Sequence, residues 1–360
     1  MTQADTAGDV MLVGSIPHKS IPQAMNMFGP PLAQHLQALP DGEVGWRRFW
    51  ITRVHFQVLA IHPDLEVIQQ PRRDNGIERI YPHDATDNWN FKVRDGVDKI
   101  VFGHPGWRLG FYQDAANSYH FFRDLKDKGL LPESVRFQVS IPSAVSAIPP
   151  RVMPHKGDLE KVRPGYIDAV RAEVLAMLDV IPAKELAIQW DCSSEMQDVY
   201  GGIAGTPAPG GIERNLPQIN ALSRDLPDDV MLGFHLCFGT LGGWPRFAPD
   251  STDKAVELAN AFIEGSGRRV DWMHIPLLDR TDEAYYAPLA ALRPDKTRLY
   301  LGMIHSMNTY EQRLALARKY VPDFGVAAYC GFGRRDPDEL QGILDDHVRA
   351  VELLQRSRRA

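Results

Sequence analysis

The stretch VMLGFHLCF, residues 230–238, places His235 and Cys237 two positions apart in an apolar run. A run of this length and composition predicts a buried strand. Successive side chains of a strand point to opposite faces, so His235 and Cys237 project to one side and Leu236 to the other. A neutral imidazole beside a thiolate can hold a metal ion, but a buried histidine next to a free cysteine is also a common core arrangement. Taken alone, the stretch favours the core arrangement.

Short apolar segments like this one recur along the chain, and helical patterns stand between most of them. The predicted strands cover 9–17, 36–43, 135–143, 185–192, 230–238, 270–278, 298–306 and 324–332. The helical patterns cover 165–181, 251–265, 311–321 and 337–357. Eight such strands predict an α/β fold, a (β/α)8 TIM barrel formed by residues 1–360 as a single domain.

The segment between the second and third strands, about 50–134, is longer than one helix. It contains FKVRDGVDKIVF, whose Asp95-Gly96 pair is typical of a hairpin turn, so we expect a small β insertion there. A second segment, GGIAGTPAPGG at 201–211, is rich in glycine and proline. That composition predicts a mobile loop near the mouth of the barrel.

Composition narrows the class of protein. Hydrophobic residues make up 44% of the chain and charged residues 24%, which is typical of a folded protein with a sizeable core. The formal net charge is −6 and no basic tract is interleaved with aromatic residues, which argues against nucleic acid as a partner. The N-terminal residues lack a signal-peptide pattern and no apolar run approaches the length of a membrane span. We therefore expect a cytoplasmic protein that does not bind membranes.

Residues capable of binding metals gather where the predicted strands end. All three cysteines follow this rule, as do His18 and three others of the twelve histidines. The residues at the strand ends are Ser15, His18, Glu43, Ser140, Ser143, Asp191, Cys192, His235, Cys237, His274, His305 and Cys330. The active site of a TIM barrel lies at the carboxyl ends of its strands, so these side chains are candidates for chemistry. Three widely separated cysteines also fit chemistry better than disulfides.

Six short motifs then resemble a known family. They are VGSIP at Val13, GE at Gly42, IQWD at Ile188, HLC at His235, IHS at Ile304 and CGFG at Cys330. Their order is similar to that of the zinc-bearing C-terminal barrel of cobalamin-independent methionine synthase. The resemblance spans nearly the whole chain, whose length suits the single-barrel branch of that superfamily.

The resemblance implies a zinc site. In the family the ligands are the histidine and cysteine of H-x-C, a glutamate after the next strand and a distant cysteine, so His235, Cys237 and Cys330 match three of four. The glutamate is missing, because MHIPLLDR places Leu277 where the family has it. His274 on the same strand is one candidate for the fourth ligand; a supporting or substrate contact is the alternative. Cys192 is expected to be a buried thiol.

The resemblance also implies a binding site for the substrate's amino-acid group. The family holds the carboxylate with the backbone at the positions of Gly14 and Ser15, and the ammonium with carboxylates at the positions of Glu43 and Asp191. Two carboxylates facing one pocket suit a cation, or one of them could act as a general base. The structural alternatives are an ion pair of Glu43 with Arg47 or Arg48, and a barrel-end hydrogen bond for Asp191.

A further histidine and several large side chains complete the expected site. His305 matches the family's histidine that supplies a proton to a leaving amine, and a purely structural histidine is the alternative. The mouth of the pocket is expected to be lined by Trp244, Phe247, Phe332, Arg334 and Arg335. The two arginines suit a carboxylate or phosphate, although a solvated rim would also contain such residues.

These features predict a zinc-dependent methyl or alkyl transferase that activates a small thiol acceptor. Its partners would be small molecules, namely the thiol and an alkyl donor, for which a folate is one candidate. The sequence is also compatible with a homo-oligomer. The missing glutamate motivates an alternative, a zinc-dependent lyase, hydrolase or demethylase acting through zinc-bound oxygen on a non-thiol, aromatic or other small molecule. A metal-binding protein without catalysis is a third hypothesis, against which Asp191 and His305 argue.

Overall fold

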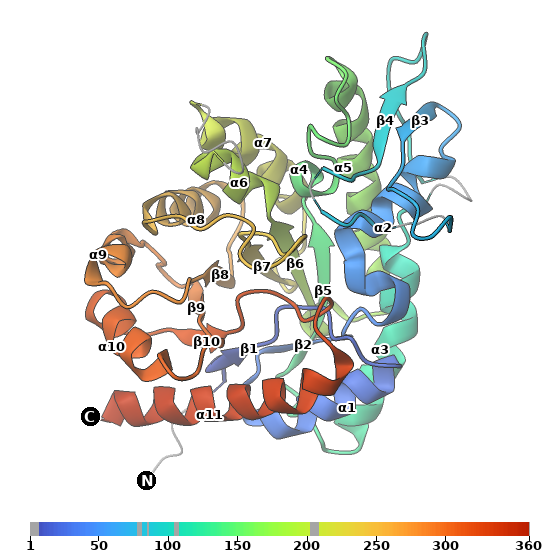
Figure 1. The fold of residues 1–360 in the computed structure, drawn as a ribbon. Coiled ribbons are helices and arrows are strands. Elements are labelled where there is room, and N and C mark those ends of the chain that lie inside the picture. The colour runs from blue at the N-terminus through green and yellow to red at the C-terminus, as the bar shows by residue number, and fades with distance from the viewer. Residues whose placement is uncertain (1–6, 78–80, 85, 104–107, 202–208, 360) are drawn as a thin grey trace.

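Eight parallel strands form a nearly closed barrel with helices between them, as the sequence predicts (Figure 1). The strands are β1 (Val10–Met11), β2 (Ala38–Pro40), β5 (Arg136–Pro142), β6 (Leu186–Cys192), β7 (Met231–Leu236), β8 (Trp272–Pro276), β9 (Arg298–Gly302) and β10 (Gly325–Ala327). Hydrogen bonding joins them in the order β1-β10-β9-β8-β7-β6-β5-β2. The ends of this sheet meet through two backbone hydrogen bonds, Gly8 N–H to His35 O at 2.9 Å and Ile16 N–H to Gly42 O at 2.6 Å.

The computed structural model describes residues 7–77, 81–84, 86–103, 108–201 and 209–359. Its longer helices are α1 (Ile21–Leu32), α3 (Phe111–Asp127), α5 (Asp158–Met177), α7 (Gly211–Ser223), α8 (Asp253–Gly265), α10 (Tyr310–Tyr320) and α11 (Leu340–Arg359). Shorter helices are α2 (Trp50–Gln57), α4 (Ala144–Ala147), α6 (Ser194–Tyr200) and α9 (Glu283–Tyr286). None of the helices in these ranges is both long and apolar enough to cross a membrane.

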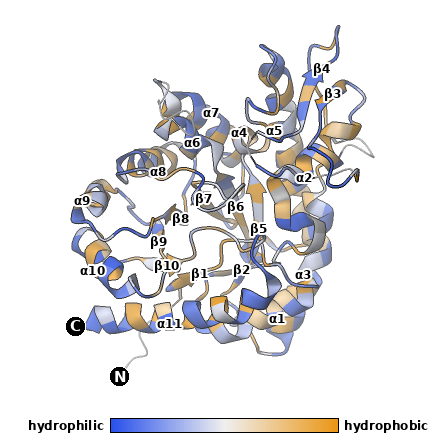
Figure 2. Ribbon diagram, in the orientation of Figure 1, coloured by the Kyte–Doolittle hydropathy of each residue, from blue (hydrophilic) through white to orange (hydrophobic). Residues whose placement is uncertain are grey.

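Two hydrophobic layers stabilise the barrel. The larger one lies between strands and helices, and Figure 2 shows β5 as largely hydrophobic while α7 and α11 carry many hydrophilic residues. The smaller one fills the barrel interior and consists of Met11, Val13, Ala38, Ala187, Trp272, Tyr300 and Ala327. Burial on both faces explains why the strands read as continuous apolar runs in the sequence.

Gly233, within the stretch that opens the sequence analysis, makes room for the largest side chain of the interior. Gly233 on β7 pairs in register with Trp272 on β8. A Cβ atom at position 233 would lie 1.8 Å from Cε2 of Trp272, far inside van der Waals contact. Glycine is therefore the residue that lets the indole fill the barrel beneath the strand ends.

The predicted β insertion lies between β2 and β5, with a different pairing from the expected one. β3 (Leu65–Gln69) pairs antiparallel with β4 (Asn90–Val93), Leu65 opposite Val93. Asp95 and Gly96 do form a turn, but residues 97–103 after it form no strand, so the predicted hairpin across this turn is wrong. The backbone of Ile100 instead donates its N–H to Lys161 O of α5 at 3.0 Å. Most of the glycine-rich segment expected to be mobile, residues 202–208, lies outside the described residues.

Candidate metal centre

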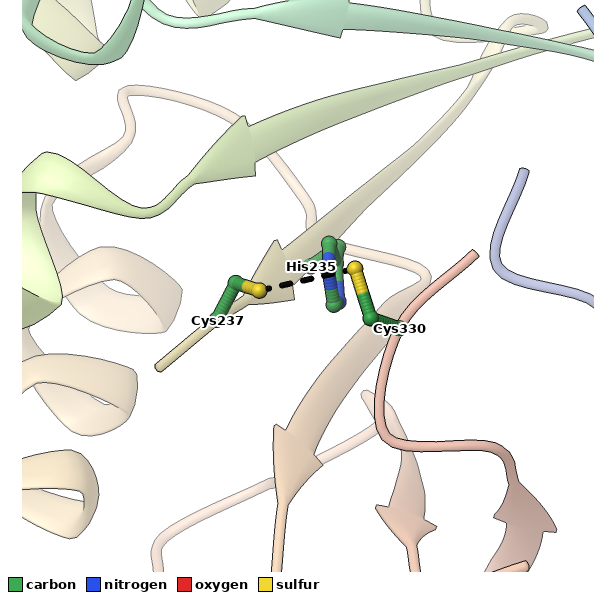
Figure 3. Close-up of side chains that lie close together, drawn as sticks. All are labelled: His235, Cys237 and Cys330. Atoms are coloured by element: carbon green, nitrogen blue, oxygen red, sulfur yellow. Dashed lines mark hydrogen bonds between the residues drawn. The ribbon is translucent and has the colours of Figure 1, made fainter. Parts of the chain in front are cut away.

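Three metal-capable side chains converge at the carboxyl ends of the strands. His235 lies near the end of β7, Cys237 follows that strand directly, and Cys330 follows β10 (Figure 3). The candidate ligand atoms all lie within 4.8 Å of one another, and the two sulfur atoms are 3.6 Å apart. This is the only such group of histidine, cysteine and carboxylate side chains within the described ranges. The strand alternation that the sequence predicts for His235 and Cys237 thus aims both toward Cys330.

The imidazole of His235 is oriented by a relay of hydrogen bonds. Nε2 of His274 lies 2.9 Å from the carbonyl oxygen of Ala328, which can only accept, so His274 carries its proton on Nε2. Burial, with a smaller effect of His235, lowers the pKa of His274 well below its usual range, so its ring is neutral. Its bare Nδ1 therefore accepts from Nδ1–H of His235, 2.8 Å away. This relay places the proton of a neutral His235 ring on Nδ1, and its Nε2 is buried without a hydrogen-bond partner.

The relay changes the expectation for His274. Both nitrogens of its ring have partners, and His274 does not belong to the three-residue group. The geometry therefore does not support His274 as a fourth ligand; it supports the alternative of a contact that orients a ligand. Gly302 makes room for this ring, because a Cβ atom at position 302 would lie 2.6 Å from Nε2 of His274.

The thiols of Cys237 and Cys330 have polar contacts that distinguish them from the thiol of Cys192. Cys237 Sγ donates to Cys330 Sγ, which raises the pKa of Cys237 and lowers that of Cys330. The backbone N–H of Gly239 donates to Cys237 Sγ at 3.2 Å, a contact that stabilises a thiolate. Cys192 is completely buried in the layer between strands and helices, and burial raises its pKa. Cys192 is thus placed as an unreactive core thiol, as expected.

Asp191 lies next to the three-residue group. It is in register with His235 across β6 and β7 and accepts a hydrogen bond of 2.7 Å from Nε2 of Gln189. Burial, and then the charge of Glu43, raises the pKa of Asp191 well above its usual range. Asp191 and the three candidate ligands line one cavity, which we call the thiol pocket.

Glu43 lines a neighbouring cavity, together with Asp41, Arg47 and Gln138. Its carboxylate accepts a 2.5 Å hydrogen bond from the hydroxyl of Ser15. Burial raises the pKa of Glu43 to about 8. Arg47 forms its 2.8 Å ion pair with Asp41, not with Glu43. The structure thus brings Ser15 and Glu43 together.

The first-strand glycine lies against this carboxylate. A Cβ atom at Gly14 would lie 3.4 Å from Oε1 of Glu43. The backbone of residues 14 and 15 therefore faces the same buried group as Asp191, whose pKa responds to Glu43. Glu43 itself has a φ of 46°, a left-handed conformation that is unfavourable for a residue with a side chain.

His305 lines a third cavity, the outer pocket, together with Trp244, Tyr329 and Phe332. Its Nε2 lies 2.8 Å from the carbonyl oxygen of Leu277, and burial lowers its pKa to about 4. A neutral imidazole at pH 7 does not act as a ready proton donor, which the resemblance implied for this position. Trp244 stacks on Tyr329 with ring centroids 4.1 Å apart, so it forms a wall of the outer pocket.

The remaining residues expected at the mouth separate into three groups. Arg334 donates to Thr240 Oγ1 at 2.5 Å, and both residues line the thiol pocket and the outer pocket. Arg335 lines the outer pocket alone and forms an ion pair with Glu339. Phe247 packs against Phe238 with centroids 5.3 Å apart and lines neither pocket.

Two arginines of the thiol pocket are not marked by any motif in the sequence. Arg151 follows α4, and Arg246 lies in the loop after β7. Arg246 belongs to the segment TLGGWPRF, in which the aromatic residues are the more conspicuous feature. Arginines in loops give no periodic signal, so only the folded chain shows that both reach the same cavity.

Comparison with solved structures supports the fold. A B12-independent methionine synthase from Shewanella sp. W3-18-1, determined in complex with selenomethionine, matches with a TM-score of 0.57. The match covers 98% of each chain at 11% sequence identity. No protein-family model and no curated protein sequence matches the chain. The likeness therefore establishes that this chain has a methionine-synthase-like TIM-barrel fold.

Proposed function

We propose that this protein is a zinc-dependent enzyme that transfers a methyl or alkyl group to a small thiol acceptor. The observation that carries the proposal is His235, whose Nε2 is buried and unpartnered and whose ring has a nitrogen within 4.8 Å of two cysteine sulfurs, at the end of the barrel where active sites lie. An unpaired buried nitrogen is costly unless a ligand satisfies it. The methionine-synthase-like fold supports an enzyme of the transferase class.

The donor set fits zinc. Two thiolates and one imidazole are a common ligand set for catalytic zinc, which keeps one position open for water or substrate. Zinc bound there would lower the pKa of a substrate thiol and so make its thiolate available at neutral pH. The open position also compensates for the missing glutamate, because three ligands from the chain are sufficient.

His274 and Gly239 prepare this donor set. His274 fixes the tautomer and the direction of His235, and such supporting contacts commonly change metal affinity about 10-fold to 100-fold. The N–H of Gly239 stabilises the negative charge on Cys237. The contacts of His274 and Gly239 therefore favour the ligand forms that a metal requires. The proton between Cys237 and Cys330 would leave when the metal binds.

The carboxyl groups suit a cationic part of the acceptor. Glu43 is largely protonated at pH 7 because its pKa is about 8, and burial raises the pKa of Asp191 in the same direction. An ammonium group placed between them would favour their charged forms, so its binding would release protons. Ser15, through its hydroxyl, holds the Glu43 carboxylate in a fixed direction. An amino-thiol acceptor is the substrate class that uses all of these groups.

Metal analysis and X-ray absorption at the zinc edge test the proposal. We expect one zinc per chain, bound by two sulfurs and one nitrogen, and an additional zinc–sulfur distance when an amino thiol is added. Less than stoichiometric zinc after purification in the presence of zinc would contradict the proposal. An unchanged sulfur count on addition of thiols would instead favour the lyase, hydrolase or demethylase alternative. The Cys192→Ser variant is the matched control and should behave as the wild type.

A further inference from the structure

The thiol pocket contains arginines that nothing in the proposed function uses. Arg48, Arg151, Arg246 and Arg334 all line it. Arg334 donates to Thr240, and the guanidinium groups of Arg48 and Arg334 lie 4.9 Å and 5.4 Å from the ring centroid of Phe49. Arg151 and Arg246 have no such contacts.

Arg151 and Arg246 are partly buried and lack counter-ions. The Nε atoms of both side chains are buried and have no hydrogen-bond partner. No carboxylate of the described residues lies within ion-pair distance of either guanidinium group. The acid that influences Arg246 is Asp84, whose carboxylate instead accepts hydrogen bonds from Thr86.

Other buried arginines of this chain show the usual arrangement. Arg53 forms an ion pair with Asp114 and donates to the carbonyl oxygen of Leu109. Arg313, fully buried, donates to the carbonyl oxygens of Met303 and Ser306. Desolvated charge is costly unless it is paired, so the lack of partners for Arg151 and Arg246 needs a reason.

We propose that Arg151 and Arg246 form a subsite for an oxyanion, a carboxylate, phosphate or sulfonate group carried by a substrate of the thiol pocket. The planar guanidinium presents several N–H donors in a fork that matches such groups. The two charges also act on each other, because burial and then Arg246 lower the pKa of Arg151 to about 10. One bound oxyanion would supply the missing acceptors and neutralise this repulsion.

The position of the subsite defines what the substrate looks like. His235, Cys237 and Cys330 line the same pocket as the two arginines. Zinc with two thiolates carries no net charge, so the arginines leave this pocket positive and select a substrate with an anionic group, which an amino thiol can carry in addition to its ammonium group. The inference rests on the proposed function only in taking this pocket as the substrate site, because oxyanion binding itself does not require the metal.

Calorimetric titration of the purified protein with inorganic phosphate, methanesulfonate and acetate tests the subsite, at constant ionic strength. We expect at least one of these anions to bind with a dissociation constant below about 10 mM, and the three affinities show which source of oxyanion is preferred. Arg151→Met and Arg246→Met should each weaken that binding at least 10-fold. Arg356→Met is the matched control, because Arg356 lies exposed on α11 beside Glu352, and its affinity should not change.

Two further measurements distinguish an arginine subsite from anion binding at the metal. Without ligand, both methionine variants should unfold at the wild-type temperature or above it, because an unpaired desolvated charge is removed. Binding that persists in both variants overturns the proposal, and so does the absence of binding by all three anions. Binding lost in zinc-free Cys237→Ser but kept in the arginine variants would place the anion on the metal, which also overturns it. A wild type without zinc whose anion binding depends on both arginines would refute the proposed function alone.

Discussion

Replacing Glu43 by glutamine should make the protein less sensitive to rising pH. Glu43 is buried, and its pKa is about 8 in the folded chain, against 4.5 for a glutamate exposed to water. Between these values the unfolded chain has lost the proton that the folded chain keeps, so stability falls as the pH rises. Glutamine resembles the protonated carboxyl group and removes this dependence.

The magnitude follows from the two pKa values. Each pKa unit corresponds to about 1.4 kcal/mol, so the whole interval corresponds to a loss of at most about 5 kcal/mol of unfolding free energy. Relaxation around the carboxylate reduces this, and we expect at least about 2 kcal/mol. At about 1.3 °C per kcal/mol for a chain of this length, the melting temperature of Glu43→Gln should gain at least about 2.5 °C on the wild type between pH 5 and pH 8.5.

Thermal unfolding of both proteins with the same zinc content, followed by circular dichroism across this pH range, measures the effect. Glu283→Gln is the control, because Lys319 lowers the pKa of that exposed carboxylate and its replacement should give no such gain. Asp191 titrates together with Glu43, so the difference reports the pair of carboxyls. A difference in melting temperature that stays constant from pH 5 to pH 8.5 would refute the argument from burial.

Three further predictions concern the candidate metal centre. Cys237→Ser and Cys330→Ser should each lose zinc, since a hydroxyl is a poor ligand compared with a thiolate, whereas Cys192→Ser should keep it; atomic absorption decides between them. His274→Ala should weaken zinc binding about 10-fold to 100-fold in chelator competition, with one nitrogen ligand in X-ray absorption before and after the change; a nitrogen count that falls from two in the wild type to one in the variant would make His274 a ligand after all. Gly302→Ala should also weaken zinc binding, because the added methyl group would displace the His274 ring. An unchanged zinc affinity would show that the ring does not need this space.

The sequence predicted those parts of the fold that appear as a pattern of apolar residues along the chain. Eight buried strands appear as apolar runs, and β7 carries His235 and Cys237 toward one side because strand geometry requires it. The hairpin at Asp95-Gly96 failed because β4 pairs with a strand more than twenty residues earlier, Leu65–Gln69. Local turn residues do not specify such a partner.

The candidate site was predictable only where motifs mark it. Three candidate ligands follow strands and lie together. The orientation of His274 depends on the carbonyl oxygen of Ala328, 54 residues away, and on the space left by Gly302. Neither contact can be predicted from the spacing of residues in a motif. The low pKa of His305 likewise results from burial, with a contribution from Arg313, and not from its motif.

The tryptophan within the barrel has a consequence for how relatives of this protein can differ in sequence. The side chains at positions 233 and 272 compete for the same space in the barrel, because a single methyl group added at Gly233 would overlap the ring of Trp272. A larger residue at 233 is therefore compatible only with a smaller one at 272, and the two positions must change in concert during divergence. Because β7 also carries His235, a chain that changes one position alone would displace the imidazole together with the strand.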